Sequence, residues 1–301
     1  MSLKKESPFD IQLHIATLNG DHDLIIKILD TGRVYVDCRD KEGTTPLILA
    51  AANGHLNCVK VLIDQGAKPA AKRNTGTTAL FFAAQGGYLD IVESLINNGA
   101  PIDSISLDGA RPLFIACQCG HENIVKELVA RGADINAQMN DRATPLFIAA
   151  QNGHYHIVLH LLARGAHPDS RRIDGATPVW IAAQMGHEFI VALLLKAGAF
   201  VDSTRHDGAT ALFKASHKGH SATIVELLKY KPNLGILPNG ESALHAAAFS
   251  GNLSVCRQLL CAGARINLKN QDGFTPRDIA RQQGQDKVYD YLLQCEKSNR
   301  N

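Results

Sequence analysis

Apolar residues form short clusters with helical spacing along the whole chain, and the same cluster returns about every 33 residues. An alanine marks each return, with a leucine or valine three residues before it in eight of nine cases and a glycine four residues after it in all nine. The alanines are Ala16, Ala50, Ala83, Ala116, Ala149, Ala182, Ala215, Ala247 and Ala280. A repeat of this period predicts a stack of similar units, each of which contacts its neighbours.

Each unit is predicted to contain a turn followed by two helices. Four units begin with a Thr-Pro pair, as at Thr45-Pro46, in which the threonine caps the helix and the proline takes the first helical position. The leucine and the alanine then lie on one helix face, and the small alanine lets the next helix approach closely. The glycine ends the first helix, because glycine adopts a left-handed conformation most readily. The second helix is apolar at i, i+3 and i+4, as in Val59, Leu62 and Ile63.

The stretch from Gly43 to Ala67 contains Gly-Thr-Thr-Pro-Leu, Ala-Ala, Gly-His, Val, Leu-Ile and Gly-Ala in that order. This motif resembles the ankyrin repeat nearly position by position, and the resemblance covers the whole chain. It implies an all-α solenoid with short β-hairpin fingers, in which about nine stacked ankyrin repeats share one continuous elongated core. We expect a single domain over residues 7–295 with short polar tails at 1–6 and 296–301. The expected units are 7–39, 40–72, 73–105, 106–138, 139–171, 172–204, 205–236, 237–269 and 270–295.

Four units depart from the motif. The first lacks the turn glycine and the Thr-Pro start, as expected of an N-terminal cap. Arg142 stands where other turns have glycine, which predicts backbone strain if that position needs a positive φ. Lys231-Pro232 replaces the usual Gly-Ala, so the stack either bends there or repacks locally, and we favour local repacking. Arg277 occupies the leucine position of the last unit, which is predicted to be a C-terminal cap with a frayed end from Gln294.

Large side chains follow the motif leucine in the middle units. This row can be interpreted as an aromatic stripe that grips a ligand or as a packing ladder between repeats, and we favour packing because large rings one repeat apart bury each other. The residues are Ile48, Phe81, Phe114, Phe147, Trp180 and Phe213.

The charge and the cysteine content indicate the class of partner and the cellular location of the protein. The net charge of +2 favours neither nucleic acid nor a membrane surface strongly. Seven cysteines, odd in number and irregular in spacing, suggest reduced thiols. The N-terminal sequence lacks the apolar stretch of a signal peptide, and no apolar run reaches the roughly 18 residues needed to span a bilayer. We therefore expect a soluble cytoplasmic protein that can also be nuclear.

The sequence offers little for catalysis. Cys117 and Cys119 point to different faces of a helix, and no second Cys/His pair stands at metal-ligand spacing. The histidines that follow the helix-ending glycine, such as His55 and His187, belong to the motif and are expected to be structural. No phosphate-binding loop, nucleophile elbow or metalloprotease motif is present. We expect no enzyme activity, no cofactor, no metal and no small-molecule substrate.

One modification motif is present. Leu128, Asp134, Ile135 and Asn136 match the Leu…Asp-aliphatic-Asn pattern that asparaginyl hydroxylation favours in ankyrin repeats. The alternative is an ordinary turn asparagine, which we favour.

The resemblance also implies a groove formed by the fingers and the first helices, where a protein partner would bind. Glutamines near the helix ends offer uncharged donors and acceptors, and arginines in the fingers suit carboxylates. Exposed Ile173 and Met185 beside Arg172 and Arg205 would form the interface centre. The candidate residues are Arg73, Asn74, Gln85, Leu107, Gln118, Asn140, Gln151, Asn152, Arg172, Ile173, Gln184, Met185, Arg205, His206, His217 and Lys218.

The leading hypothesis is thus a monomeric scaffold that binds an extended or loop segment of a protein. A nucleic-acid-binding repeat protein is the first alternative, but it would need a continuous basic stripe, and Glu42, Asp108, Asp141 and Asp174 interrupt the finger row. A self-associating structural repeat is the second. A third possibility is that the finger positions are merely solvated. A fourth is that the outer helices carry the contact with the partner.

Overall fold

The computed structural model describes residues 7–298, so the predicted tail at 1–6 and residues 299–301 lie outside the described part of the chain. The described residues form eighteen α-helices. They are α1 (Pro8–Leu18), α2 (His22–Asp30), α3 (Pro46–Ala52), α4 (Leu56–Asp64), α5 (Ala79–Gly86), α6 (Leu89–Asn97), α7 (Pro112–Cys119), α8 (Glu122–Ala130), α9 (Pro145–Gln151), α10 (Tyr155–Ala163), α11 (Pro178–Met185), α12 (Glu188–Lys196), α13 (Ala211–Lys218), α14 (Ser221–Leu228), α15 (Ala243–Phe249), α16 (Leu253–Cys261), α17 (Pro276–Gln282) and α18 (Asp286–Ser298).

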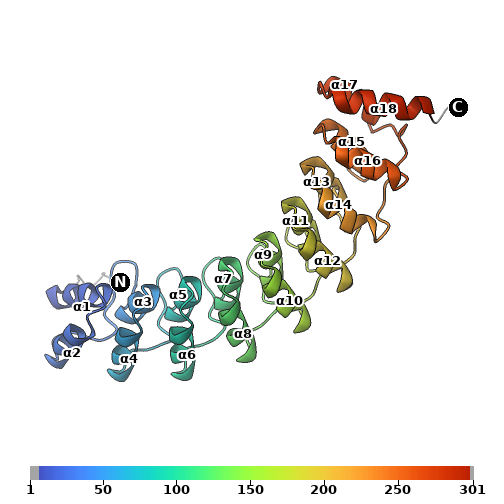
Figure 1. Cartoon of the computed structure of the whole chain (residues 1–301). Helices are drawn as coiled ribbons and strands as arrows, with labels where there is room; N and C mark the ends of the chain where they lie inside the picture. Colours follow the sequence, from blue (N-terminus) through green and yellow to red (C-terminus); the bar gives the residue numbers. More distant parts are fainter. Residues whose placement is uncertain (1–6, 299–301) are drawn as a thin grey trace. The chain divides into compact units, whose positions relative to one another are not determined.

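The contacts divide the chain into a unit that ends at Asn140 and a unit that begins at Asp141. Within each unit the helices stack in pairs (Figure 1). Each odd-numbered helix packs against the even-numbered helix that follows it and against the next odd-numbered helix of the same unit, and the even-numbered helices pack against one another in turn. Both units are therefore all-α solenoids. The prediction of one domain over 7–295 stays a prediction.

Capping residues begin the first helices where the sequence predicts. Thr45, Thr144, Thr177 and Thr275 adopt extended backbone conformations, and their hydroxyl oxygens each accept a hydrogen bond from the backbone N–H three residues on. Proline then occupies the first helical position, where its missing N–H leaves no intrahelical bond unmade.

The end of each first helix is also a contact between repeats. Gly186, for example, follows α11 with a φ of 81°. The ring of His220 from the next repeat lies against it, and Nε2 of His220 donates to the carbonyl oxygen of Gln184 at 3.0 Å. His55, His121 and His187 make the same bond, to the carbonyl oxygens of Leu18, Gln85 and Gln151. The structural role predicted for these histidines is confirmed, because each satisfies a carbonyl that the helix end leaves unpaired.

The core consists of the motif leucine and alanine and the apolar face of the second helix. Leu80, Ala83 and Leu95 illustrate this arrangement, each 0% exposed. Phe114, Phe147, Trp180 and Phe213 are also buried, and Nε1 of Trp180 donates to the carbonyl oxygen of Ala209 at 3.0 Å. The packing interpretation of the aromatic row is therefore confirmed for these residues.

The turns before the first helices connect neighbouring repeats by backbone hydrogen bonds. In the first unit the N–H of Asn74 donates to the carbonyl oxygen of Glu42, and in the second unit the N–H of His206 donates to that of Asp174. Within single turns, antiparallel bridges pair Lys72 with Thr78 and Thr204 with Thr210. The backbone bonds of Asn74 and His206 hold successive turns in register.

The irregular repeats are accommodated locally. Lys231 takes the place of glycine with a φ of 49°, and Asn233 donates its N–H to Oδ1 of Asp202 at 2.9 Å. Leu237 fills the space beside Phe213 and Ala246, so helices α13 and α15 still pack together, as the favoured interpretation predicts.

The C-terminal cap differs from the expectation of a frayed end. Arg277 forms an ion pair with Glu296, which is buried, and α18 continues to Ser298, past the expected boundary at 295. The carboxylate of Glu296 gives the guanidinium at the leucine position a charged partner.

We expect Gly186→Ala to lower the free energy of unfolding by about 1–3 kcal/mol. A Cβ atom there would lie 2.8 Å from Nδ1 of His220, in addition to the strained φ. Gly198→Ala is the matched control, because Gly198 has a φ of 92° but a Cβ atom added to it would meet nothing within 4 Å. Urea unfolding followed by circular dichroism compares the two. Equal losses would contradict a packing role for the histidine.

Arg142→Gly should raise the free energy of unfolding by about 1 kcal/mol, because Arg142 has a φ of 66° and glycine adopts this conformation without strain. Arg142→Ala keeps the Cβ atom and should give no such gain. A thermal melt of the three proteins tests both statements. A lower melting temperature for Arg142→Gly would show that the arginine side chain itself stabilises the fold.

Candidate functional site

The candidate residues of the first unit occupy the turns before α5, α7 and α9 and the ends of α5 and α7. Arg73 pairs with Glu42 and lies over the ring of Phe82, with its Cζ 5.6 Å from the ring centroid. The side-chain amides of Asn74 and Asn140 donate to the carbonyl oxygens of Lys41 at 3.1 Å and Leu107 at 2.9 Å. These asparagines therefore stabilise the row of turns. Leu107, Gln85 and Gln118 are exposed.

The candidate residues of the second unit occupy equivalent places. Arg172, Ile173, Arg205 and His206 lie in the turns before α11 and α13. The remaining residues stand at the ends of the first helices α9, α11 and α13, and they are Gln151, Asn152, Gln184, Met185, His217 and Lys218.

A compact charged cluster organises the turns of the second unit. Arg172 donates to both carboxylate oxygens of Asp174, from Nε at 3.1 Å and from Nη2 at 2.7 Å. Nε of Arg205 lies 3.2 Å from Oδ2 of the same aspartate. The guanidinium of Arg172 also lies over Phe147 and that of Arg205 over Trp180, with centroid distances of 5.5 Å and 5.3 Å. Both arginines are held between a carboxylate and an aromatic ring.

The electrostatics of this cluster favour the ionised pair. Burial alone would raise the pKa of Asp174, but the hydrogen bonds from Arg172 and from the Ala176 N–H, together with the charges of Arg172 and Arg205, outweigh it and hold the pKa below its usual value. The same hydrogen bond raises the pKa of Arg172. Sequence reasoning treated Asp174 only as an interruption of the basic row and missed it as the centre of the cluster.

The expected interface centre is only partly assembled. Ile173 is 61% exposed and Met185 48% exposed, as an interface residue should be. However, Ile173 precedes α11 and Met185 ends it, so the two side chains lie at opposite ends of a helix about 12 Å long. The arginines and Ile173 form one group, and Met185 belongs to another.

Met185 belongs to a row at the C-terminal ends of the first helices. His217 at the end of α13 stacks on Phe249 at the end of α15, with ring centroids 5.8 Å apart and an interplanar angle of 21°. Burial and the charges of Lys214 and Lys218 lower the pKa of His217. Phe249 is 46% exposed and was missed by sequence reasoning, although it occupies the repeat position of Gln151, Gln184 and His217.

The first unit exposes an apolar stripe that sequence reasoning also missed. Ile11, Ile15 and Leu18 of α1 are 45%, 52% and 51% exposed and lie on one face at spacings of four and three. Together with His14, Asp40 and Leu49 of α3 they line a hollow of about 190 Å³. The sequence could have indicated this stripe, because Leu18 stands at the repeat position that is glutamine in the middle repeats.

The remaining sequence hypotheses concern modification, metals and membranes. Asn136 is half-buried, and its N–H donates to Oδ1 of Asp134 at 3.1 Å, but its hydroxylation stays a prediction. Within residues 7–298, which hold all seven cysteines, no disulfide forms, and burial raises the pKa of the Cys117 thiol. The same residues contain no cluster of three or more His, Cys, Asp or Glu side chains suited to a metal. None of their helices has the length and hydropathy to cross a membrane.

Stacked helix pairs joined by capped turns define a helical-repeat protein. Comparison with known families identifies the family of the repeat. The family model described as ankyrin repeats (3 copies) matches residues 13–106, 100–172, 146–236 and 219–301. The chain therefore belongs to the ankyrin-repeat family. Proteins of this family are typically non-enzymatic interaction modules that bind other proteins, and no catalytic family is indicated for the chain.

Several curated proteins are similar to parts of the chain. Ankyrin repeat domain-containing protein 29 of Homo sapiens is 48% identical over 67 residues, which are 22% of this chain and 22% of that protein. The protein of the same name from Danio rerio is 46% identical over 67 residues, with the same two shares of 22%. E3 ubiquitin-protein ligase KEG of Arabidopsis thaliana is 46% identical over 55 residues, 18% of this chain and 3% of that protein. The matched segments span about a fifth of the first two relatives, so these similarities identify the repeat and not a partner.

The lowered pKa of Asp174 leads to a pH-dependent prediction. A carboxylate whose pKa is lower in the folded than in the unfolded state, where it is about 3.9, stabilises the fold above that value and stops doing so as the pH falls through the folded pKa. We expect Asp174→Asn to be less stable than the unchanged protein by about 1 kcal/mol at pH 7. The difference should shrink below about pH 4. A gap that is independent of pH in urea unfolding would show that Asp174 acts through shape alone.

Proposed function

We propose that the chain is a non-enzymatic scaffold that binds an extended or loop segment of a protein partner along its turns and first helices. Membership of the ankyrin-repeat family supports the class of function. We further propose that the chain has about nine repeats with finger-like turns and that these turns and the first helices line a groove. We also propose that the chain is a monomer located in the cytoplasm or nucleus. Seven cysteines, odd in number and irregular in spacing, favour such a reducing location.

The observation that carries the proposal is the group formed by Arg172, Ile173, Asp174 and Arg205. Ile173 is 61% exposed and stands in the chain between Arg172 and Asp174, and Asp174 holds the side chains of Arg172 and Arg205 in place. Side chains that are ordered before binding lose little conformational entropy when a partner arrives. Interfaces also concentrate their binding energy in arginine and apolar anchors. We infer that a partner segment places an apolar side chain against Ile173.

The cluster also favours a protein partner over nucleic acid. Phosphate backbones are bound by basic side chains that release counterions, and such binding needs charges that are not already neutralised. In this protein Asp174 pairs with Arg172 and Arg205, and Glu42 pairs with Arg73. The finger-like turns therefore present hydrogen-bonding edges and apolar groups instead of a continuous basic stripe.

Capture of the partner from a cell lysate tests the proposal. The bait is the whole chain, either unchanged or carrying Ile173→Ala, Met185→Ala and Lys218→Ala, which alter exposed side chains. Arg172 and Arg205 stay in place because their removal would disturb the Asp174 cluster. We expect the partner identified with the unchanged bait to bind the triple variant at least tenfold more weakly, the effect of about 1.4 kcal/mol.

The matched control alters the opposite helices of the same unit. Leu159→Ala, Phe189→Ala and Val225→Ala remove three exposed side chains from α10, α12 and α14, and this variant should bind the partner as the unchanged protein does. Both variants must first unfold with the same cooperativity. Loss of binding in the control variant, with retention in the groove variant, would place the site on the second helices and refute the groove.

A further inference from the structure

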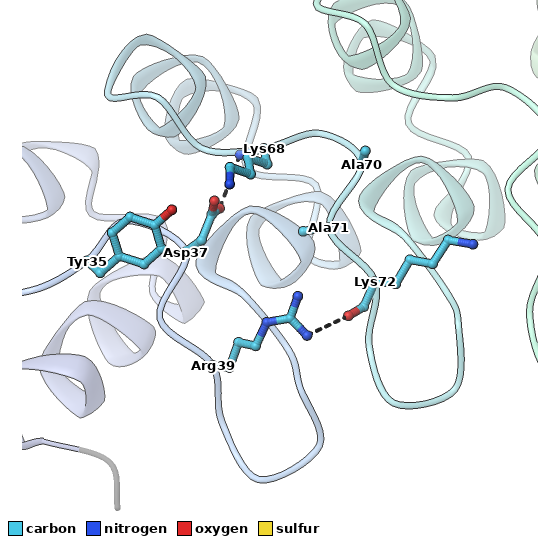
Figure 2. A pocket seen from close by; sticks show the side chains of 7 residues that line it. All are labelled: Tyr35, Asp37, Arg39, Lys68, Ala70, Ala71 and Lys72. Carbon is cyan, nitrogen blue, oxygen red and sulfur yellow. Dashed lines mark hydrogen bonds between the residues drawn. The ribbon is translucent and has the colours of Figure 1, made fainter. Parts of the chain in front are cut away.

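A hollow of about 440 Å³ lies in the first unit, between the segment that joins α2 to α3 and the segment that joins α4 to α5 (Figure 2). Its charged lining groups are three cations and one carboxylate, a net charge of +2 (three minus one). The lining residues are Tyr35, Asp37, Arg39, Lys68, Ala70, Ala71 and Lys72.

Two hydrogen bonds hold the walls of the hollow. Nη1 of Arg39 donates to the carbonyl oxygen of Lys72 at 3.1 Å, and the N–H of Lys68 donates to Oδ1 of Asp37 at 3.1 Å. Figure 2 shows these bonds on different sides of the hollow, with the small side chain of Ala71 between them. A guanidinium has five N–H donors, and the bond to Lys72 uses one of them. Arg39 is therefore fixed in position with further donors to offer.

The carboxylate of Asp37 also lines the hollow. Asp37 is 8% exposed, and its Oδ2 has no hydrogen-bond partner among the described residues. A buried acceptor without a donor is unfavourable. The hollow therefore combines an unused acceptor with cationic donors, and a ligand that carries both a donor and an anion would satisfy both.

The same backbone arrangement recurs in the second unit and serves as an internal comparison. Nη1 of Arg171 donates to the carbonyl oxygen of Thr204 at 3.1 Å, as Arg39 does to that of Lys72. The N–H of Phe200 lies 3.0 Å and 3.2 Å from the two oxygens of Asp169, so both are used. The bridges of Lys72 with Thr78 and of Thr204 with Thr210 are equivalent too.

The side chains around Arg171 are different. His167, Phe200, Asp202, Ser203 and Thr204 stand where the first unit has Tyr35, Lys68, Ala70, Ala71 and Lys72. With Arg171 and Asp169 these residues give a net charge of −1 (one cation, two carboxylates). Since the backbone forms equally well with this opposite charge, the cations around Arg39 are not needed for the fold.

We propose that the hollow around Arg39 binds a phosphomonoester group carried by a segment of the protein partner, an inference that rests on the proposed function. A phosphomonoester carries about −1.5 to −2 charges near pH 7 and three acceptor oxygens, which suit a guanidinium and an ammonium group. A peptide N–H of the same segment supplies the donor for Asp37, and the headgroup of phosphatidic acid, a lipid phosphomonoester, has no N–H. The ammonium of Lys72 turns away from Arg39 in Figure 2, but its flexible stem lets it reach a ligand at the rim.

The hollow is also well placed for such a segment. Arg73 and Asn74 follow Lys72 directly in the chain and belong to the turn before α5, which is part of the proposed groove. A segment that lies along the turns of the first unit can therefore insert one phosphorylated side chain into the hollow.

Nuclear magnetic resonance of the ¹⁵N-labelled whole chain tests the proposal. The probes are N-acetyl-phosphoserine N-methylamide, the same compound without phosphate, and phosphatidylcholine vesicles that contain phosphatidic acid. We expect saturable chemical-shift changes of the amides at 35–39 and 68–72 with the phosphorylated probe and not with the other two probes. The amides at 167–171 and 200–204 should not shift.

The matched variant Lys68→Phe with Lys72→Thr replaces the two lysines of the hollow by the residues found at the equivalent positions 200 and 204. It should fold and bind the phosphorylated probe at least roughly tenfold more weakly, the effect of losing about one charge-assisted hydrogen bond. Lys68→Gln with Lys72→Gln, which removes both charges but keeps polar, unbranched side chains, should lose affinity in the same way. Unchanged affinity in both folded variants overturns the proposal.

Three other outcomes also overturn it. They are the absence of a saturable shift, equal shifts of the amides around Arg39 and of those around Arg171, and binding to the phosphatidic acid vesicles without binding to the phosphorylated probe, which would indicate a membrane surface. Failure here is distinct from failure of the proposed function. If the Lys68→Phe, Lys72→Thr variant still captures the lysate partner while the Ile173, Met185 and Lys218 variant does not, the scaffold proposal stands and the phosphate site does not.

Discussion

The stack depends on the contact between the glycine that ends one first helix and the side chain that the next repeat places against it. At Gly186 the left-handed backbone exposes a carbonyl at the helix end, and the ring of His220 covers the glycine and donates to the carbonyl oxygen of Gln184. The small glycine thus makes room for a ring whose N–H pairs with the carbonyl oxygen at the end of the neighbouring helix. Asn252 uses a side-chain amide in the same way, toward the carbonyl oxygen of Ser216.

This contact explains why binding residues can be both exposed and ordered. The first helices and the turns are held by bonds between repeats, so an exposed apolar side chain such as that of Ile173 is not needed to hold the stack together. Ile173 projects from such a turn, and Asp174 orders the arginines beside it. A repeat protein can therefore vary its surface, as around Arg39 and Arg171, while the backbone beneath stays the same.

Regular parts of the fold were predictable because short-range rules and the repeat agree. Threonine caps, the glycine at the helix end and the apolar spacing each act over a few residues, and the period shows which units are neighbours. The positive φ at Arg142 followed by analogy with the glycines of other turns. The pairing of Arg277 with Glu296 could not be predicted in this way, because it joins the first and second helices of a cap that departs from the motif.

The amino-acid sequence by itself determined the family, the helix pairs, the structural role of the histidines and the burial of most of the aromatic row, since all of these recur with the period. Only the tertiary structure decided how the exposed side chains are combined. It separated Ile173 from Met185 along α11, gathered Arg172 and Arg205 on Asp174, and surrounded the hollow at Asp37 with cations. The physical reason is that a repeat specifies which positions face outward, whereas contacts among those side chains depend on distances between neighbouring turns that no single motif position encodes.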